Sequence, residues 1–318
     1  MKSRADAKPN VSRRSFLQGA AAAGATIAMG GNLRKSNAAN IQQVSDSDGH
    51  AGVLVDLTRC IGCRICEAAC VAANDLPELE APVEDKTVFE SRRRTDTRTY
   101  TVVNRYATSD ALGDPVYEKV QCMHCAEPAC ASACLVGALH KTPEGPVIYD
   151  QDLCIGCRYC LIACPFNIPT YEYDRALDPK VQKCHMCYHR ISRGELPGCV
   201  AECPVDALTY GRRRDLIKLA RNRIRQYPDR YIDHIYGEHE AGGTSWLYIS
   251  GAPFDDVGLP TDLGTQPFPV YTKEFLSFVP LVLVVWPALL GGMYLMSRAR
   301  EQEDDTEDIH VHGGSERP

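Results

Sequence analysis

"CIGCRYCLIACP", residues 154–165, decides the fold, because it sets four cysteines at short fixed intervals ahead of a proline. The first three cysteines follow one another at C-x2-C-x2-C spacing, and the fourth comes after three more residues. All 16 cysteines of the chain fall into four groups of four: Cys60, Cys63, Cys66 and Cys70; Cys122, Cys125, Cys130 and Cys134; Cys154, Cys157, Cys160 and Cys164; Cys184, Cys187, Cys199 and Cys203. Because no cysteine is left over, one kind of chemistry has to account for every group.

Three kinds of chemistry use cysteine in sets of four. Disulfides suit an exported chain with an even cysteine count, but such a density of bridges belongs to small scaffolds. Zinc takes four thiolates and uses C-x-x-C pairs, yet it does not explain the third cysteine or the proline. The spacing C-x2-C-x2-C-x3-C-P is the bacterial ferredoxin pattern, which favours 4Fe-4S clusters. In that pattern three thiols of one loop hold one cluster, and the fourth is directed to a second cluster.

An internal repeat indicates that the groups form two related units. "CIGCR" occurs at residue 60 and again at residue 154, and "ACLVGAL" resembles "ECPVDAL". Between the first two groups lies an insert whose segment "TRTYTVVNRY" (97–106) alternates as a strand does, and residues 138–154 predict a hairpin turning at 143–145. We therefore expect an α+β fold of duplicated two-cluster ferredoxin-like units with an inserted β-rich segment, plus one C-terminal transmembrane helix.

Residues 1–39 predict a twin-arginine signal peptide. Arg13 and Arg14 precede Ser-Phe-Leu, a mild apolar run follows, and "SNAAN" (36–40) offers small residues for cleavage. The twin-arginine pathway exports proteins already folded, often with a cofactor inserted. The thiols of an exported chain can therefore be occupied before they reach an oxidising compartment.

The charge of the mature chain argues against binding nucleic acid. Residues 1–39 contain seven Lys/Arg and one Asp, which leaves 28 basic against 40 acidic residues and a net charge of −12. Phosphate backbones require clustered Lys and Arg. The basic runs at 91–98 and 211–227 are interpreted as a solvated loop and the polar side of a helix, with docking of an acidic partner as the alternative.

Residues 275–297 form an uncharged stretch that predicts a transmembrane helix. Its 23 residues would reach roughly 35 Å at the rise of an α-helix, enough to cross a bilayer. Arg298 and Arg300 follow directly, so the positive-inside rule places this end in the cytoplasm. We expect 40–270 to be the four-cluster ferredoxin-like domain on the periplasmic side and 298–318 to be an acidic cytoplasmic tail, disordered over residues 301–318.

Several features together resemble the four-cluster iron–sulfur subunits of hydrogenase-2 type. They are the signal, the four cysteine groups, the segment "HIYGEHEAGGTSWLYISGAPFDDVGLP" (234–260) and the C-terminal span, and the similarity covers nearly the whole chain. The cysteine pattern alone is shared with electron-transfer subunits of formate dehydrogenases and of sulfoxide, polysulfide and nitrite reductases. The Tyr-Gly-Glu and Gly-Gly-Thr segment together with the anchor points more narrowly to the hydrogenase type.

This resemblance implies that the first group pairs with the fourth, and the second with the third. The implied 4Fe-4S ligand sets are Cys60, Cys63, Cys66 and Cys203; Cys70, Cys184, Cys187 and Cys199; Cys122, Cys125, Cys130 and Cys164; and Cys134, Cys154, Cys157 and Cys160. Residues 122–164 then form an inner ferredoxin unit, and residues 60–70 with 184–203 form an outer unit. All sixteen positions are cysteine, so four clusters are expected.

The function expected from the resemblance is electron transfer without catalysis in this chain. The expected partners are the small and large subunits of a periplasmic nickel–iron hydrogenase and a multi-span membrane subunit that reacts with quinone. A molybdopterin enzyme as catalytic partner is the first alternative, and a secreted binding module held by disulfides or zinc is the second. Residues between the ligands that either tune clusters or simply pack are Arg64, Arg158, Tyr159 and Tyr188. His124 and His185 lie inside C-x-x-C loops, and because sixteen cysteines leave no iron position open, we expect them to form hydrogen bonds or lie at the surface rather than ligate iron.

Overall fold

The computed structural model describes residues 49–107, 115–175 and 179–312, with side chains to residue 298. The signal peptide, with Arg13 and Arg14, and residues 313–318 lie outside the described residues. Within them, a three-stranded sheet joins distant parts of the chain in the order β8-β1-β9. Strand β1 (Ala51–Asp56) pairs antiparallel with β8 (Leu208–Arg212) and parallel with β9 (Trp246–Ile249).

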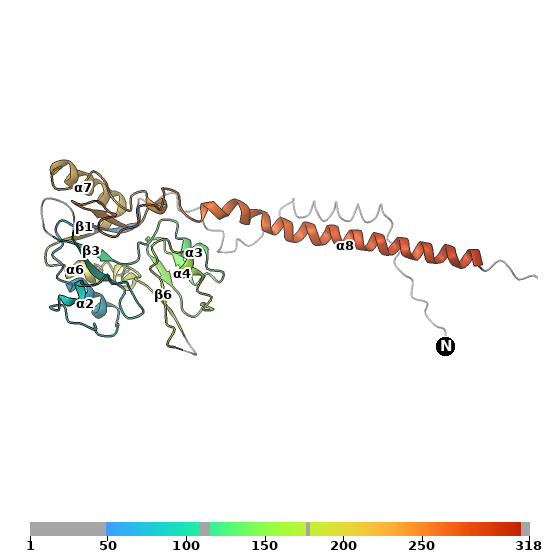
Figure 1. Cartoon of the computed structure of the whole chain (residues 1–318), viewed down its shortest axis with the longest axis horizontal. Coiled ribbons are helices and arrows are strands. Elements are labelled where there is room, and N and C mark those ends of the chain that lie inside the picture. Colours follow the sequence, from blue (N-terminus) through green and yellow to red (C-terminus); the bar gives the residue numbers. More distant parts are fainter. Residues whose placement is uncertain (1–48, 108–114, 176–178, 313–318) are drawn as a thin grey trace, which may run out of the picture. The chain divides into compact units, whose positions relative to one another are not determined.

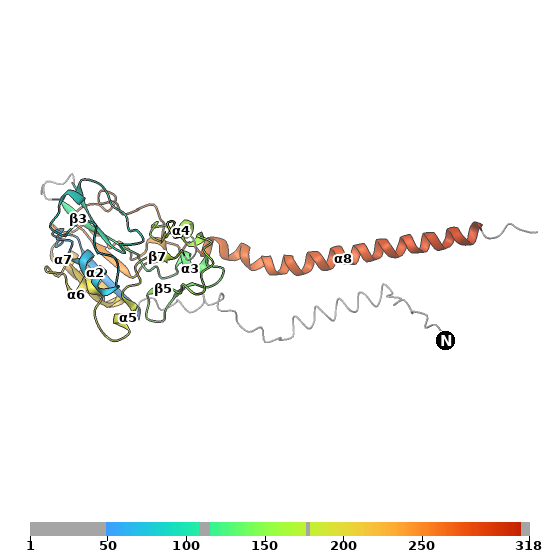
Figure 2. The same cartoon turned by 90° about the horizontal axis from the view of Figure 1, so that it is seen from below.

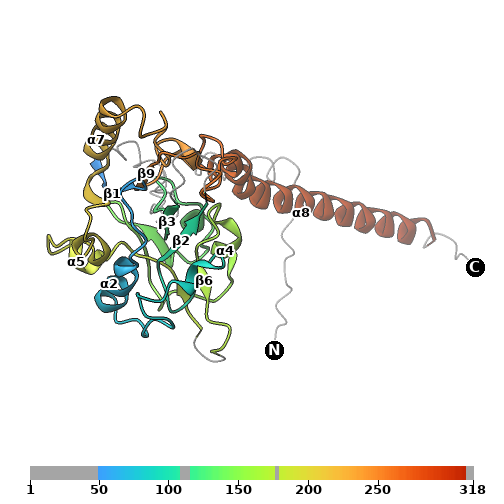
Figure 3. The ribbon, with the colours of Figure 1, turned by 60° about the vertical axis from the view of Figure 1, so that its left-hand side comes forward.

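Side chains alternate between the two faces of this sheet, and each face is buried in a different apolar cluster. Helix α7 (Arg213–Gln226) lies beside one face of the sheet (Figure 3). On that face Leu54 packs with Leu216 and Ala220 in one apolar cluster. The neighbouring strand residues Val53 and Val55 belong to a different cluster on the other face. Because successive strand residues point to opposite faces, the sheet separates α7 from the cysteine-rich side. The helix predicted within 211–227 is confirmed.

Two helices that carry cysteines of the first and fourth groups pack against each other. Helix α2 (Ile65–Ala73) lies beside α6 (Gly198–Ala201), as Figure 2 shows. A Cβ at Gly198 would lie 2.8 Å from the Ala73 Cβ and 2.9 Å from the Ala69 carbonyl oxygen, so only glycine allows this approach. A further short helix, α5 (Tyr188–Ile191), belongs to the loop between the cysteines of the fourth group.

The second and third groups are connected by a hairpin. Strand β4 (Leu139–Lys141) pairs antiparallel with β5 (Val147–Tyr149), and the chain turns between them as predicted. The cysteine-bearing helices α3 (Ala129–Ser132) and α4 (Tyr159–Ala163) lie side by side next to this hairpin (Figure 1). A short antiparallel pair, β6 (Thr170–Tyr171) with β7 (Val181–Gln182), follows α4.

The insert after the first group supplies its own two-stranded sheet. Strand β2 (Val102–Tyr106) pairs antiparallel with β3 (Val116–Val120), which confirms the strand predicted in 97–106. Short 3-10 helices lie at Thr87–Phe89 (η2) and Glu240–Gly242 (η3). At Glu118 and Lys119 strand β3 is covered on both sides, so two adjacent charged residues are buried.

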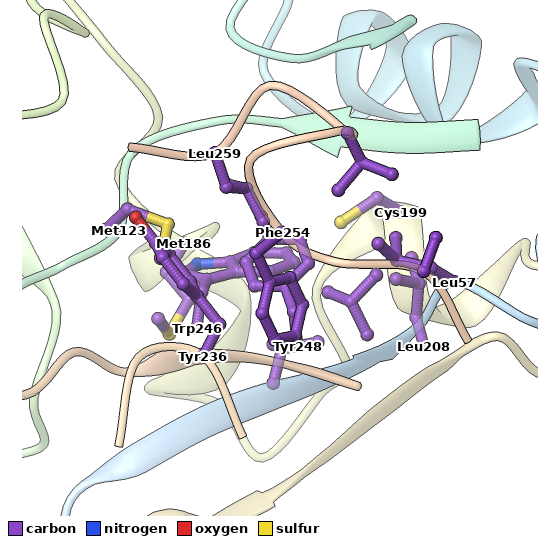
Figure 4. Packing of buried hydrophobic residues seen from close by; sticks show 14 residues of the cluster. Leu57, Met123, Met186, Cys199, Leu208, Tyr236, Trp246, Tyr248, Phe254 and Leu259 are labelled. Atoms are coloured by element: carbon purple, nitrogen blue, oxygen red, sulfur yellow. The ribbon is translucent and has the colours of Figure 1, made fainter. Parts of the chain in front are cut away.

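The largest apolar cluster brings aromatic rings and cysteine-bearing elements together. Figure 4 shows Trp246 close to Met123 and Met186, while Cys199 lies with Leu57 and Leu208 at the other end of the cluster. Trp246 is fully buried and contributes much apolar area, because aromatic side chains bury the most surface of any residue. Met123 belongs to the second cysteine group, and Met186 and Cys199 belong to the fourth, so the cluster packs the sheet against loops of both units.

A long helix, α8 (Val270–His312), follows the folded domain. Within the described residues, its segment Val270–Arg298 is the one helix long and apolar enough to cross a membrane, with a mean hydropathy of 2.1. Pro280 and Pro287 lie inside the helix, which does not break at either position. The disorder expected for residues 301–318 is wrong as far as His312, because α8 continues through the acidic residues.

Candidate iron–sulfur sites

Cysteines from the first and fourth groups line one cavity together. Its thiols are those of Cys60, Cys63, Cys66 and Cys203, three from one loop and one from the other. Burial raises the pKa of the Cys60 thiol to about 11, and it raises the pKa of Cys66 further. Strand pairing explains this meeting: β1 leads into Cys60 and β8 follows Cys203, with Val55 opposite Leu208.

A second cavity combines the remaining cysteines of the same two groups. It is lined by Cys70, Cys184, Cys187 and Cys199. The Asn74 side-chain amide donates toward two of these sulfurs, 3.5 Å to Cys70 Sγ and 3.8 Å to Cys187 Sγ. Burial raises the pKa of the Cys184 thiol to about 12. The packing of α2 on α6 therefore brings Cys70 to the thiols of the fourth group.

Cysteines of the second and third groups also lie near one another, because helices α3 and α4, which carry Cys130 and Cys160, pack together. Burial raises the pKa of the Cys125 thiol, and the nearby thiolates of Cys164, Cys130 and Cys122 raise it further. Burial also raises the pKa of Cys160 to about 11, with further contributions from Cys134, Cys154 and Cys157. Each of these neighbourhoods contains three cysteines of one group and the fourth cysteine of the other. Cys157 is the one exposed thiol of the sixteen.

Left-handed backbone turns recur inside all four cysteine loops. Positive φ angles occur at Gly62, Arg64, His124, Gly156, Arg158, Met186 and Cys187. Such turns direct successive amides inward, and two of these amides reach sulfur: Met186 N donates to Cys184 Sγ at 3.3 Å, and Gly156 N to Cys154 Sγ at 3.4 Å. Bonds of this kind stabilise thiolates and lower their basicity.

The donor sets fit iron–sulfur clusters better than the two alternatives. The structure joins none of the sixteen cysteines in a disulfide. In the described part of the chain, no three His, Cys, Asp or Glu side chains converge closely enough to hold a single metal ion, as tetrahedral zinc requires. Four soft thiolate donors around a shared space are the ligands that a 4Fe-4S cluster takes.

A buried ion network holds the first cysteine loop against the insert. The Glu67 carboxylate is fully buried and accepts hydrogen bonds from Arg64 Nη2 at 3.0 Å, Arg93 Nη2 at 2.5 Å and the Val103 amide at 2.7 Å. Arg64 also donates to backbone carbonyls of the insert, including Pro82 O at 2.6 Å. The 91–98 run is therefore not simply a solvated loop, because Arg93 reaches from it into this network.

The other residues singled out between the ligands mostly pack or form hydrogen bonds. Arg158 lies over the rings of Tyr171 and Tyr173, 5.6 Å from each centroid. His124 is buried, and its Nδ1 accepts a hydrogen bond from the Val147 amide at 2.8 Å. Burial lowers the pKa of His185 to about 4. Tyr159 is half-exposed. The Tyr188 hydroxyl donates to Glu144 Oε2 at 3.3 Å in an exposed hydrogen bond. Sequence reasoning missed Glu67, Glu118 and Lys119, charged residues buried against the expected pattern of solvated charges.

Comparisons with known proteins agree with this description of the sites. Residues 114–213 match the 4Fe-4S dicluster domain, and residues 10–30 match the signal sequence of the twin-arginine translocation pathway. The hydrogenase-2 operon protein HybA of Shigella flexneri is 32% identical over 343 residues, covering 96% of this chain and 99% of that protein. The iron–sulfur subunit of the nitrate-inducible formate dehydrogenase of Escherichia coli is 31% identical over 280 residues, 84% of this chain and 92% of that subunit.

A protein of Nitratidesulfovibrio vulgaris is 51% identical over 292 residues, which cover 91% of this chain and 78% of that protein. The fold and the thiol-lined cavities define an iron–sulfur protein of the ferredoxin type. The chain belongs to the family of twin-arginine-exported 4Fe-4S electron-transfer subunits that includes HybA and the formate dehydrogenase iron–sulfur subunits.

Replacing Glu67 by alanine tests the network at the first loop. Glu67→Ala leaves two arginines without their shared carboxylate, so we expect the free energy of unfolding to fall by about 3–5 kcal/mol. Urea unfolding of the anaerobic protein measures this change, and iron content should fall with it. Glu80→Ala is the matched control, because its pair with Arg98 is 3.9 Å long, exposed and worth at most about 1 kcal/mol. Equal effects of the two substitutions would contradict the role of Glu67.

The buried carboxyl of Glu118 should make the free energy of unfolding depend on pH. Burial raises its pKa to about 7, against smaller lowering effects from Tyr106 and Arg92. A raised folded-state pKa means that the native protein holds this proton more tightly than the unfolded chain. The protonated Glu118 carboxyl therefore stabilises the fold fully below the ordinary pKa of glutamate, and this stabilisation is lost as the pH rises towards about 7.

Glu118→Gln should therefore flatten the pH dependence between about pH 5 and 8 and stabilise the protein at pH 8 by an amount on the order of 3 kcal/mol. Urea unfolding at several pH values measures it, with Glu78→Gln on the surface as control. A pH profile that Glu118→Gln leaves unchanged would show that this carboxyl does not carry the proton.

Proposed function

We propose that this chain is a non-catalytic electron-transfer subunit with four 4Fe-4S clusters. The observation that carries the proposal is the lining of the two outer cavities: each combines three cysteines of one group with the last cysteine of the other, as in two-cluster ferredoxins. The proposed ligand sets are Cys60, Cys63, Cys66 and Cys203; Cys70, Cys184, Cys187 and Cys199; Cys122, Cys125, Cys130 and Cys164; and Cys134, Cys154, Cys157 and Cys160.

Each cluster would take up one electron at a time, so that the four together give electrons a path through the chain. The residues of the chain hold the thiols in place, donate amides to the sulfurs and exclude water from most of the sites. Cys157 is the exception, since it is the one exposed thiol of the sixteen. The set that contains it is therefore the proposed site of contact with a redox partner.

We further infer that the two ferredoxin units arose by duplication. Each unit has an antiparallel strand pair, β1 with β8 or β4 with β5, and a pair of packed helices, α2 with α6 or α3 with α4. In each unit one strand leads into a cysteine group and the other follows one. Because both units have the same strand pair and the same helix pair, the repeat in the sequence corresponds to a repeat in the fold.

The proposed catalytic partner is a periplasmic nickel–iron hydrogenase. The relative named as a hydrogenase-2 operon protein matches over 99% of its own length and 96% of this chain, more of both than the formate dehydrogenase subunit does. A molybdopterin formate dehydrogenase remains the second candidate, because that subunit is almost equally identical. The proposed electron acceptor on the other side is a multi-span membrane subunit that reacts with quinone.

The proposed orientation has the cluster domain in the periplasm and the end of α8 in the cytoplasm. The twin-arginine signal supports export, and the apolar segment Val270–Arg298 supports anchoring in the membrane. Arg298 and Arg300 directly after the apolar stretch favour the cytoplasmic side for this end.

If the chain holds four 4Fe-4S clusters, its iron and sulfide content after purification without air is fixed. We expect about 16 iron and about 16 acid-labile sulfide ions per chain, with the broad visible absorption of 4Fe-4S clusters. Iron and sulfide analysis with quantitative protein determination measures this. A colourless product containing zinc, or cystines detected by mass spectrometry, would contradict the proposal.

The metal of the co-purified catalytic partner separates the two candidate complexes. A pull-down of the membrane-solubilised complex through this chain should contain nickel in a near-equimolar amount, because a nickel–iron enzyme is the proposed partner. Elemental analysis of the eluate provides the measurement. Molybdenum or tungsten in place of nickel would assign the chain to a molybdopterin enzyme while leaving its cluster content unchanged.

A further inference from the structure

We propose that the Lys119 ammonium raises the reduction potentials of the two clusters of the outer unit together. This proposal rests on the proposed function, because it concerns the clusters held by the first and fourth cysteine groups. It assigns to a single residue of the insert an electrostatic role at two sites at once.

Lys119 lies between the two thiol-lined cavities. It lines the cavity of Cys60, Cys63, Cys66 and Cys203, and it also lines the cavity of Cys70, Cys184, Cys187 and Cys199. Its side chain comes from β3 of the insert and is buried, with 2% of the residue exposed. The insert therefore places one positive charge where both outer sites are close to it.

The contacts of this ammonium are all neutral. Lys119 Nζ donates to Thr101 Oγ1 at 2.7 Å and to Gln121 Oε1 at 3.0 Å, and it lies 4.6 Å from the centroid of the Trp246 ring. Within residues whose side chains the structure describes, no carboxylate forms an ion pair with it. A buried cation without a counter-charge is strongly unfavourable. Anionic clusters in the two neighbouring cavities would supply the missing negative charge.

Another cation at these sites differs from Lys119 in this respect. Arg64 also lines the first cavity, but it does not line the second, and it forms an ion pair at 3.0 Å with Glu67, a carboxylate that it shares with Arg93. A nearby carboxylate offsets part of the field of the two arginines, whereas no carboxylate offsets the Lys119 charge, and charges interact more strongly in a buried region than in water. Lys119 is therefore the cation that lines both outer cavities, and we expect its charge to act on both outer clusters.

The direction of the effect follows from the charge that reduction adds. An electron makes a cluster more negative, so a nearby cation favours the reduced form and raises its potential. Removal of the charge should lower both outer potentials and leave the inner pair nearly unchanged. Lys141 provides a matched comparison, because its Nζ binds the carbonyl oxygens of His124 and Cys125 at 3.1 and 2.8 Å, beside the inner thiols.

The test is a redox titration of the whole complex followed by electron paramagnetic resonance. Lys119→Gln should make reduction of two of the four clusters about tenfold less favourable, which is about 59 mV for one electron. Lys141→Gln should move a different cluster, and Lys119→Arg, which keeps the charge, should restore the outer potentials. Four loaded clusters with unchanged potentials in Lys119→Gln, or an equal shift of all four, would overturn the proposal.

Loss of clusters from a Lys119 variant and loss of clusters from the unaltered protein lead to different conclusions. If Lys119→Gln fails to retain iron, Lys119→Arg decides: retained clusters at native potentials support the role of the charge, and loss of iron there too shows that Lys119 acts by shape alone. Absence of clusters from the unaltered protein would instead refute the proposed function. The two failures are therefore distinguishable.

Discussion

The exchange of the last cysteine between groups constrains the rest of the structure. A loop at the start of the domain can share a site with Cys203 only if the backbone brings the two regions together, and the pairing of β1 with β8 does so. The hairpin of β4 and β5 likewise brings the second and third groups together, although these two groups lie much closer to each other in the sequence. The order of strand pairing therefore gives a physical reason for which groups meet.

Burial of so many thiols makes electrostatics the second constraint. Desolvation raises the pKa of most of them, so that as thiolates they require positive charge close by. Iron would supply most of this charge, and amides and buried lysines would supply the remainder. The insert contributes here as well as in packing: Lys119 lines both outer cavities, and Arg93 and Arg64 clamp Glu67 beside the first loop. An uninterrupted ferredoxin repeat would lack these contacts.

The parts of the fold predictable from sequence are those specified by local pattern. Cysteine spacing predicted the loops, the turn at 143–145 predicted the hairpin, and the apolar stretch predicted the candidate span. The parallel addition of β9 was not predictable, since its partner strand lies far away in sequence. Lys119 and Glu118 were missed for a related reason. A lysine and a glutamate side by side in a strand normally mark a solvated face, and only tertiary packing covers both. The acidic residues after Arg298 suggested disorder, yet they continue α8 to His312.

The assignment of cysteines to clusters has one direct measurement. It is an anomalous-difference map at the iron absorption edge, from crystals of the protein purified and grown without air. The proposed ligand sets predict four compact iron peaks, with Cys70 bound to the same cluster as Cys184, Cys187 and Cys199, and Cys203 bound with the cysteines of the first loop. Iron coordinated by all four cysteines of a single group, or fewer than four such peaks, would contradict the exchange on which the account depends.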